Sequence, residues 1–285
     1  MTLEKVNFTP SKGLLIELDH LRDENPTIYQ SLEQFETHNH SGAYQGAANV
    51  LHSMLPPRSV ILDVGCGFGE TSIYLASLGH SIHSVEPAES RCEALNMSAK
   101  NLQLPIHTYM CTGEELDKLS LPLIDGCLFF SSLHHCDDPL RALSNIKKIL
   151  KPGGLILINE PILKFYRSKQ WFCRQLIENP VKIGHYGGNE HIYYFSEYYN
   201  MLHSAGFKNI EFYWSDKFSC PRKTFQRDLS CQIQGQYQHS IFKSLVKYTI
   251  HSILHKMSNS KRLNKAIIAK LLRISLFQAS FIAQA

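Results

Sequence analysis

Short apolar runs alternate along this chain with segments in which apolar residues recur every three or four positions. The first pattern is typical of strands buried in a parallel sheet, and the second is typical of helices that cover one. Strands are expected at residues 60–64, 81–85, 106–110, 124–131 and 155–159. Helices are expected at residues 70–78, 89–101, 114–119, 139–150 and 196–205. This alternation predicts an α/β fold with a doubly wound parallel sheet that binds ligands beyond the carboxyl ends of its strands.

The first expected strand ends in a turn that is rich in glycine. Asp63 comes near the end of the apolar run, and Gly65, Gly67 and Gly69 alternate after it. Glycine lets the backbone turn tightly and approach a ligand where a Cβ atom would collide. The helix that follows presents free amide groups and a positive dipole end to this turn. The pattern indicates a strand-turn-helix unit that binds a nucleotide.

The spacing of these glycines disfavours a dinucleotide as the ligand. A dinucleotide site uses G-x-G-x-x-G to seat a pyrophosphate, whereas this chain has G-x-G-x-G after an acid. Asp63 would repel a diphosphate but can hold an ammonium group. Glu86 ends the second strand 21 residues after Gly65, close to the roughly 20-residue spacing of a ribose-binding carboxylate. We therefore expect Glu86 to accept both ribose hydroxyls; the alternative is an exposed acid in a turn.

The D-x-G-x-G-x-G pattern from Asp63 to Gly69 resembles the first motif of the class I S-adenosylmethionine-dependent methyltransferases. Residues 129–139 and 150–154 resemble segments of the small-molecule, type 11-like members of that family. The resemblance implies S-adenosyl-L-methionine (SAM) as the cofactor. It also implies a Rossmann-like sheet of seven strands, the last of them antiparallel. The similar segments are 60–161 and, less closely, 189–213.

The strand ends and the resemblance together give the expected cofactor-binding residues. The segment that begins at Thr112 resembles the one that lies beside the adenine ring in such enzymes. Many members of the family carry an acid at the position of Thr112. The expected set is Asp63, Gly65, Cys66, Gly67, Glu86, Pro87, Thr112, Gly113 and Ser131.

Three histidines are the candidates for catalysis. Methyl transfer needs alignment of the acceptor with the sulfonium, which can contribute about 7–11 kcal/mol, and a base whose pKa lies near the working pH, which suits histidine. His134 and His135 follow the fourth strand, where the methyl group is expected, and His191 adjoins Glu190 in a polar, aromatic segment. The alternative roles are loop shaping or helix capping for the first two and hairpin packing for the third. No metal site is expected, because adjacent histidines rarely bind one ion together with a suitably spaced acid.

The chain divides into four parts by composition and pattern. Residues 1–58 are expected to form an N-terminal helical lid, 59–214 the Rossmann-like core, 215–274 a basic helical insertion or cap, and 275–285 the final core strand, antiparallel beside 209–214. Lid side chains that can close over the cofactor are Tyr29, His38, His40 and Tyr44.

The insertion is the most basic part of the chain. After Asp228 there are eight Lys or Arg residues and no Asp or Glu. Three interpretations stay open: a helical cover with a solvated charged face, a surface at 241–273 that binds an anionic acceptor or lipid headgroup, and a binding site for nucleic acid. The formal net charge of only +4 and the scarcity of aromatic platforms disfavour nucleic acid.

These features predict methyl transfer from SAM to a small-molecule acceptor, or to a carbohydrate- or lipid-linked one, by in-line displacement, with oxygen the favoured acceptor atom. The alternative is a SAM-binding regulatory module that performs no transfer and acts through its basic cap. A nicotinamide oxidoreductase is disfavoured by the glycine spacing. Eight cysteines without a C-x-x-C pair, and no leader or long apolar run, predict a cytoplasmic protein that is at most peripheral to a membrane.

Overall fold

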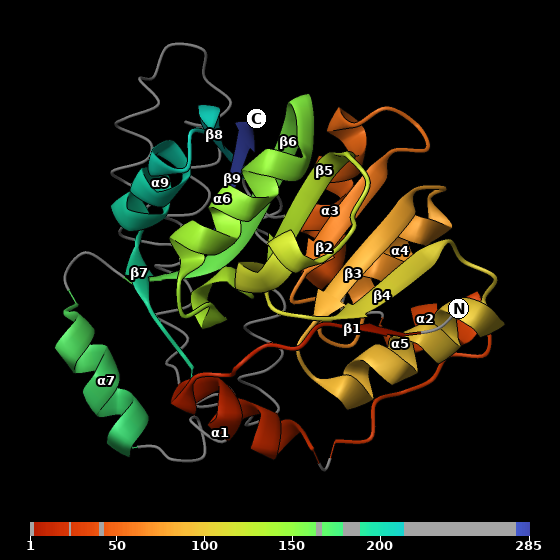
Figure 1. The fold of residues 1–285 in the computed structure, drawn as a ribbon, viewed down its shortest axis with the longest axis horizontal. Helices are drawn as coiled ribbons and strands as arrows, with labels where there is room; N and C mark the ends of the chain where they lie inside the picture. Colours follow the sequence, from red (N-terminus) through yellow and green to blue (C-terminus); the bar gives the residue numbers. More distant parts are fainter. Residues whose placement is uncertain (1–2, 23, 40–42, 164–166, 179–188, 214–277) are drawn as a thin grey trace, which may run out of the picture.

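A nine-stranded sheet with helices on both faces forms the centre of the protein (Figure 1). The computed structural model describes residues 3–22, 24–39, 43–163, 167–178, 189–213 and 278–285. The strands are β1 (Glu4–Lys5), β2 (Val60–Val64), β3 (Ser81–Glu86), β4 (Ile106–Met110), β5 (Ile124–Phe130), β6 (Leu150–Leu163), β7 (Tyr193–Tyr194), β8 (Lys208–Tyr213) and β9 (Gln278–Gln284). The α-helices are α1 (Lys12–Leu21), α2 (Leu32–His38), α3 (Ala43–Met54), α4 (Glu70–Ser77), α5 (Glu89–Asn101), α6 (Pro139–Ile149), α7 (Lys169–Glu178) and α9 (Phe195–Ser204), and two 3₁₀ turns are η1 (Gly113–Lys118) and η2 (Leu133–His135).

The strand order confirms the doubly wound sheet. The order is β1-β4-β3-β2-β5-β6-β9-β8, and β7 pairs with β6. All pairs are parallel except those of β9, which runs antiparallel to both β6 and β8. The seven expected strands are therefore present, and the last is antiparallel as predicted. The short β1 and β7 were not expected, because two residues carry no period that a sequence pattern can register.

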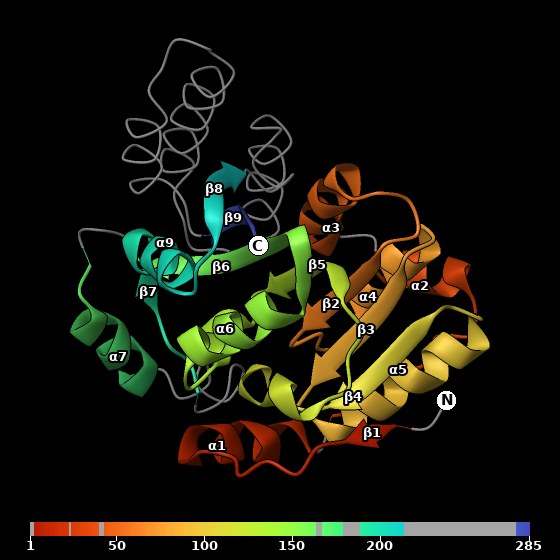
Figure 2. The ribbon, with the colours of Figure 1, turned by 45° about the horizontal axis from the view of Figure 1, so that its top comes forward.

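Alternate side chains of the central strand β2 enter two separate cores. Ile61 lies with Leu51 and Ile73 on the face that α3, α4 and α5 cover. Its neighbour Leu62 lies on the opposite face with Ile146 of α6, where α6 and α9 pack side by side (Figure 2). Both β2 residues are completely buried. A strand buried on both faces needs an unbroken apolar run, and this is the feature that made β2 recognisable in the sequence.

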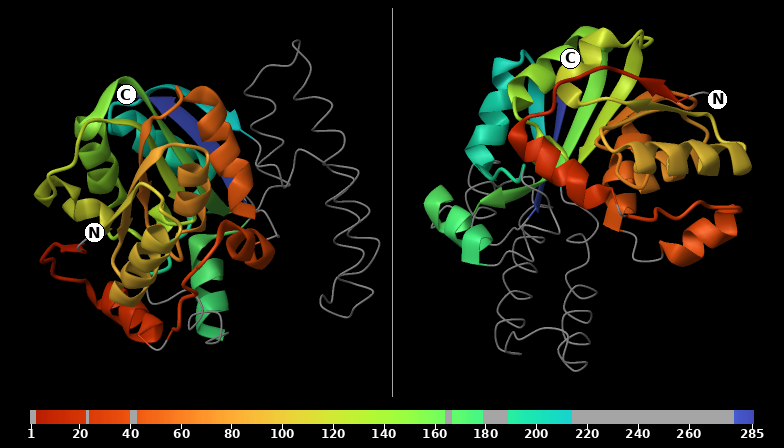
Figure 3. Two further views of the ribbon diagram at one scale, coloured as in Figure 1. Left: turned by 90° about the vertical axis from the view of Figure 1, so that its right-hand side faces the viewer. Right: turned by 60° about the horizontal axis from the view of Figure 1, so that its bottom comes forward.

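The expected N-terminal lid separates into two parts. Residues 4–21 form β1, which extends the sheet beside β4, and α1, which lies across the edge where the parallel strands end (Figures 2 and 3). Residues 29–39 and 43–54 pack on the face of the sheet instead, where the Tyr29 amide donates to the Ser98 hydroxyl of α5 and α3 contacts α4. The segment that covers the strand ends is thus 4–21, which lies within the expected lid but contains none of the lid side chains named from the sequence.

The basic insertion predicted at 215–274, with its candidate lipid-binding surface at 241–273, lies outside the described residues. Within the part of the chain that the structure describes, no helix combines the length and apolar character needed to cross a membrane.

Gly69, the residue before α4, has a backbone conformation that favours glycine and packs closely against α5. Its φ is 81°, and a Cβ atom built on it would lie 2.4 Å from a Leu95 methyl carbon. Leu95 is buried in the core, so a side chain at Gly69 would meet both backbone strain and steric overlap.

We expect Gly69→Ala to destabilise the protein more than Gly79→Ala does. Gly79 also has a positive φ, 92°, but a Cβ atom there meets no atom within 4 Å. The control variant therefore carries the backbone strain alone, whereas Gly69→Ala adds an overlap that costs about 1–3 kcal/mol. Denaturant unfolding monitored by circular dichroism measures both. Equal losses in the two variants would contradict the close packing of this turn against α5.

Candidate functional site

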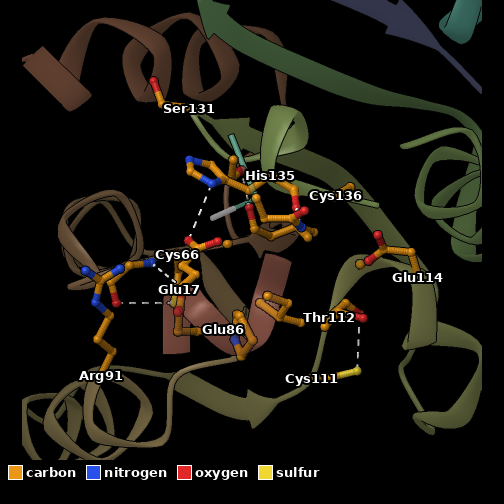
Figure 4. Close-up of a pocket in the computed structure, with 18 of the residues that line it drawn as sticks. Glu17, Cys66, Glu86, Arg91, Cys111, Thr112, Glu114, Ser131, His135 and Cys136 are labelled. Carbon is orange, nitrogen blue, oxygen red and sulfur yellow. Dashed lines mark hydrogen bonds and ion pairs between the residues drawn. The ribbon is translucent and has the colours of Figure 1, made fainter. Parts of the chain in front are cut away.

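A cavity of about 550 Å³ opens at the carboxyl-terminal edge of the parallel strands (Figure 4). It lies where the strand order reverses, since β3 flanks β2 on one side and β5 flanks it on the other. Open α/β sheets bind ligands in this crevice, and the volume is within the range of small-molecule sites. The walls come from the glycine turn after β2, the segments after β3, β4 and β5, and residues 8–17 of the N-terminal segment.

The glycine turn forms the base of the cavity and packs tightly against the loop after β5. The Gly65 amide donates to the Val85 carbonyl over 2.7 Å. A Cβ atom on Gly65 would lie 2.4 Å from the Cβ atom of Ser132. The Ser132 hydroxyl in turn donates to the Val64 carbonyl over 2.6 Å. Glycine is required at position 65 because two strand-end loops meet there.

Glu86 is held rigidly at the end of β3 and lines the cavity. One carboxylate oxygen accepts from the Gly67 amide over 3.0 Å and the other from the Ala88 amide over 3.2 Å. Burial raises the pKa of Glu86, while Arg91 and the two amides oppose the rise. Each carboxylate oxygen can still accept another hydrogen bond. The residue therefore suits the predicted role as acceptor for two ribose hydroxyls.

Asp63 does not face the cavity. Its side chain is buried beneath the turn, where one carboxylate oxygen accepts hydrogen bonds from the hydroxyls of Thr71 and Ser72 at the start of α4. Burial raises its pKa to about 6, although these two hydroxyls lower it. A direct contact between Asp63 and an ammonium group, as expected from the sequence, has no support in this geometry. The carboxylate instead ties the glycine turn to the helix.

The other expected cofactor residues do meet at the cavity. The predicted residues that line it are Gly65, Cys66, Gly67, Glu86, Pro87, Thr112, Gly113 and Ser131. Of the lid candidates, Tyr44 lines the cavity. Tyr29 and His38 pack against each other away from it, with ring centroids 5.9 Å apart, and His40 lies outside the described residues.

A buried acid, Glu160 of β6, shapes the loop that follows β5. One of its carboxylate oxygens accepts from the amides of Ser132 and Leu133, each over 2.9 Å. The other oxygen lies 2.5 Å from Nδ1 of His134. The side chain of Glu160 is completely buried. This carboxylate therefore holds the η2 turn and orients the His134 ring.

The two adjacent histidines of η2 converge on Glu190. Nε2 of His134 lies 3.6 Å from Glu190 Oε2, and Nε2 of His135 lies 3.5 Å from the same oxygen. Nδ1 of His135 lies 3.4 Å from Glu17 Oε1 of α1 (Figure 4). Burial by itself lowers the pKa of His134, but the carboxylates of Glu160 and Glu190 raise it to about 10. The two carboxylates thus favour the protonated form of His134.

The segment that carries Glu190 is joined to the histidine turn on both sides of this residue. The His191 amide donates to the His134 carbonyl over 3.1 Å, and the Asn189 side-chain amide donates to the His135 carbonyl. The His191 ring pairs with Asn189 Oδ1 over 3.2 Å and does not line the cavity. Its place indicates a positioning role for His191 and leaves His135 as the predicted catalytic histidine that lines the cavity.

Two further acids belong to the site, and from the sequence only Glu160 is placed at this rim of the sheet, without an assigned role. Glu160 had a recognisable signal, since it is an acid at the end of an apolar strand. Glu17 had none, because α1 carries no acid pattern that distinguishes one carboxylate from another and only the tertiary fold brings it to His135.

The comparisons with known proteins agree with this geometry. The profile of a family described as "methyltransferase domain" matches residues 38–211. The chain belongs to this family. Its Rossmann-like sheet is that of the class I SAM-dependent methyltransferase family, and SAM is the expected cofactor of such a domain.

Curated relatives match the core of the chain. It is 32% identical over 127 residues to an O-methyltransferase of Pyrenophora dematioidea, covering 40% of this chain and 44% of that protein. It is 27% identical over 164 residues to a SAM-dependent Diels-Alderase of Talaromyces variabilis, covering 55% of this chain and 56% of that protein. The chain thus spans about half the length of the curated relatives it matches.

A solved structure confirms the fold over almost the whole chain. The 1,6-didemethyltoxoflavin-N1-methyltransferase of Burkholderia thailandensis, solved with its acceptor and S-adenosylhomocysteine, aligns with a TM-score of 0.53 at 14% identity. The alignment covers 98% of this chain and 92% of that one. At this identity the likeness concerns the fold alone.

The two acids near the glycine turn predict different effects on cofactor binding. Glu86→Ala removes the acceptor for two hydroxyls, so the affinity for SAM should fall at least tenfold, as expected for a loss of about 1.5–3 kcal/mol. Asp63→Asn keeps an oxygen for Thr71 and Ser72 and touches no cavity wall, so the affinity should stay within about threefold of the wild type.

Isothermal titration of SAM into each purified variant measures both affinities. Thermal melts of the same samples show whether the variants are folded. A large loss in Asp63→Asn with none in Glu86→Ala would reverse the roles that the geometry gives to the two acids.

Proposed function

We propose that this protein transfers the methyl group of SAM to a hydroxyl oxygen of a small-molecule acceptor. One observation carries the proposal: a single cavity joins the predicted cofactor residues at the ends of β2 and β3 to His135, which pairs with Glu17. The residues predicted to bind the cofactor and the histidine proposed as proton acceptor thus line the same cavity. Relatives named O-methyltransferases support oxygen as the acceptor atom.

The order of residues along the cavity favours one orientation of the cofactor. A ribose held by Glu86 and an adenine edged by Thr112 place the nucleoside over β3 and β4. The amino-acid tail would then lie over the glycine turn near Gly65, and the sulfonium would face the loop from Ser131 to His135. The acceptor would enter from the side of this loop. In-line alignment in such a space supplies most of the acceleration of a displacement at a methyl carbon.

His135 is the residue that we propose for proton removal. It lies in the cavity wall with 22% of its side chain exposed, and its Nδ1 faces Glu17 Oε1. A histidine that is oriented by a carboxylate can take a proton from a hydroxyl, as general bases do. His134 is less suited, because its side chain is only 4% exposed and does not line the cavity.

Family membership favours an enzyme over a regulatory module that only binds SAM. The basic segment through which such a module would act lies outside the described residues, as do residues 241–273 of the candidate lipid surface. Because one relative is a SAM-dependent Diels-Alderase, an assay must detect S-adenosylhomocysteine and not merely the loss of a substrate. A carbohydrate- or lipid-linked hydroxyl stays within the proposed acceptor class.

We expect the full-length protein to release S-adenosylhomocysteine when it is supplied with SAM and a panel of phenols, alcohols and sugar or lipid alcohols. The product should be heavier than the acceptor by one methylene group, with the methyl on oxygen. Matched amines should react less well. Methylation of the amines alone, or conversion of a substrate without release of S-adenosylhomocysteine, would contradict the proposal.

His135→Gln should lower kcat at least a hundredfold, as expected when proton removal is lost. The affinity for SAM should change little, because Glu86 and the glycine turn are untouched. His107→Gln is the matched control, since His107 is exposed and lies outside the cavity wall. If His135→Gln turns over at the rate of His107→Gln, the histidine does not remove the proton.

A further inference from the structure

We propose that His134, His135 and Glu190 form a binding site for a divalent transition-metal ion at the acceptor end of the cavity. One ligand atom from each of the three side chains lies within 4.8 Å of the other two. Both Nε2 atoms approach the same carboxylate oxygen, at 3.6 Å for His134 and 3.5 Å for His135. The two rings also lie close, with centroids 4.2 Å apart.

These separations match the size of a coordinated ion. Zn²⁺ binds histidine nitrogen and carboxylate oxygen at about 2.0–2.2 Å, so two ligands of a tetrahedral ion lie about 3.4 Å apart. The observed nitrogen-to-oxygen separations of 3.6 and 3.5 Å are too long for hydrogen bonds and close to this value. An ion can therefore be accommodated with small side-chain movements.

Glu190 has an unpartnered oxygen that is aimed at the two rings. Its Oε2 is buried and accepts no hydrogen bond from any described residue. Burial of this oxygen is costly, because no hydrogen bond replaces its lost water and the two imidazole nitrogens approach it only at ion-pair distance. A cation held by the two Nε2 atoms would supply the missing interaction.

Each histidine has a carboxylate on the side away from Glu190. Glu160 Oε2 lies 2.5 Å from Nδ1 of His134, and Glu17 Oε1 lies 3.4 Å from Nδ1 of His135. Histidines that bind metals usually donate their other ring N–H to such a group, which fixes the ring and leaves the free lone pair toward the ion. Glu160 thus orients the His134 ring by a hydrogen bond, whereas Glu17 approaches Nδ1 of His135 only at ion-pair distance.

The ligand set indicates the class of ion. Two imidazole nitrogens and one carboxylate oxygen suit Zn²⁺ and its transition-metal neighbours, whereas Mg²⁺ and Ca²⁺ prefer oxygen ligands alone. Three protein ligands leave a coordination position open, as in catalytic zinc sites. His135 lines the cavity, so we place the open position on that side.

The catalytic role of such an ion rests on the proposed function, but the binding of the ion does not. A divalent cation lowers the pKa of a hydroxyl that binds to it, and it would thereby assist the proton loss that methyl transfer to oxygen requires. In the loaded protein His135 would be a ligand, and the cation would take over the activation of the acceptor. In the competing account, a proton on His134 alone holds the cluster together. That account predicts that no metal ion binds stoichiometrically.

The proposed site departs from the sequence expectation of no metal, which rested on the adjacency of the two histidines. Neighbouring residues usually point in different directions, but the tight η2 turn and the hydrogen bonds of its carbonyls to residues 189 and 191 bring both rings to one acid.

Zinc titration of the full-length protein tests this site directly. The protein is freed of metals with a chelator, the chelator is removed, and Zn²⁺ is titrated by calorimetry, with bound zinc counted by mass spectrometry. We expect one Zn²⁺ per chain. Glu190→Gln and His135→Gln should each weaken binding at least tenfold. The control His107→Gln replaces an exposed histidine of β4 outside the cavity wall and should bind like the wild type.

Two further measurements distinguish the loss of a zinc ligand from poor folding of a variant. Glu190→Asp keeps the carboxylate and should retain more zinc affinity than Glu190→Gln. Co²⁺ bound in place of Zn²⁺ should give visible absorption typical of nitrogen and oxygen coordination, and this signal should be lost in His135→Gln. The absence of stoichiometric zinc in the wild type, or equal affinity in the wild type and Glu190→Gln, would overturn the site.

The outcomes separate this inference from the proposed function. Full methyl transfer by protein that neither contains nor binds zinc would refute the ion and leave the transfer intact. Stoichiometric zinc at these residues without methylation of any hydroxyl would support the ion and refute the proposed reaction.

Discussion

Buried carboxylates at the ends of neighbouring strands determine the shape of this site. Asp63, Glu86 and Glu160 lie near the carboxyl ends of β2, β3 and β6, and none is more than 4% exposed. A carboxylate removed from water must accept hydrogen bonds, because desolvation is otherwise uncompensated. The donors come from the loops around each acid: the hydroxyls of Thr71 and Ser72, the amides of Gly67 and Ala88, and the amides of Ser132 and Leu133. The loops are therefore fixed in position before any ligand binds, which is the preorganisation that catalysis by alignment needs.

The features that the sequence predicted well are those set by local pattern. The strand of residues 106–110 and the helix of residues 89–101 have the predicted bounds, because apolar periodicity and turn residues bracket each of them. The glycine spacing predicted the turn after β2. The structure gives the steric reason for glycine there, because a Cβ atom on Gly65 would overlap with Ser132. Glu86 reaches the cavity as expected, since the strands of a parallel sheet all end at one edge.

The features that the sequence did not predict depend on which side chains meet across the fold. Asp63 and Leu62 are neighbours, yet their side chains point to opposite faces, and alternation along β2 turns the acid toward α4 instead of the cavity. Glu190 and His135 are far apart in the chain, and their meeting depends on hydrogen bonds of Asn189 and His191 that no periodicity encodes. The N-terminal segment that carries Glu17 reaches the site only because β1 pairs with β4.

The central claim is that the strand-end acids create one cavity in which the cofactor faces the histidine cluster. A crystal structure of the full-length protein with S-adenosylhomocysteine tests it most directly. The account predicts both ribose hydroxyls on the carboxylate of Glu86 and the sulfur atom directed toward the turn that carries His135. A nucleoside bound with its sulfur directed away from that turn, or bound outside this cavity, would contradict the account.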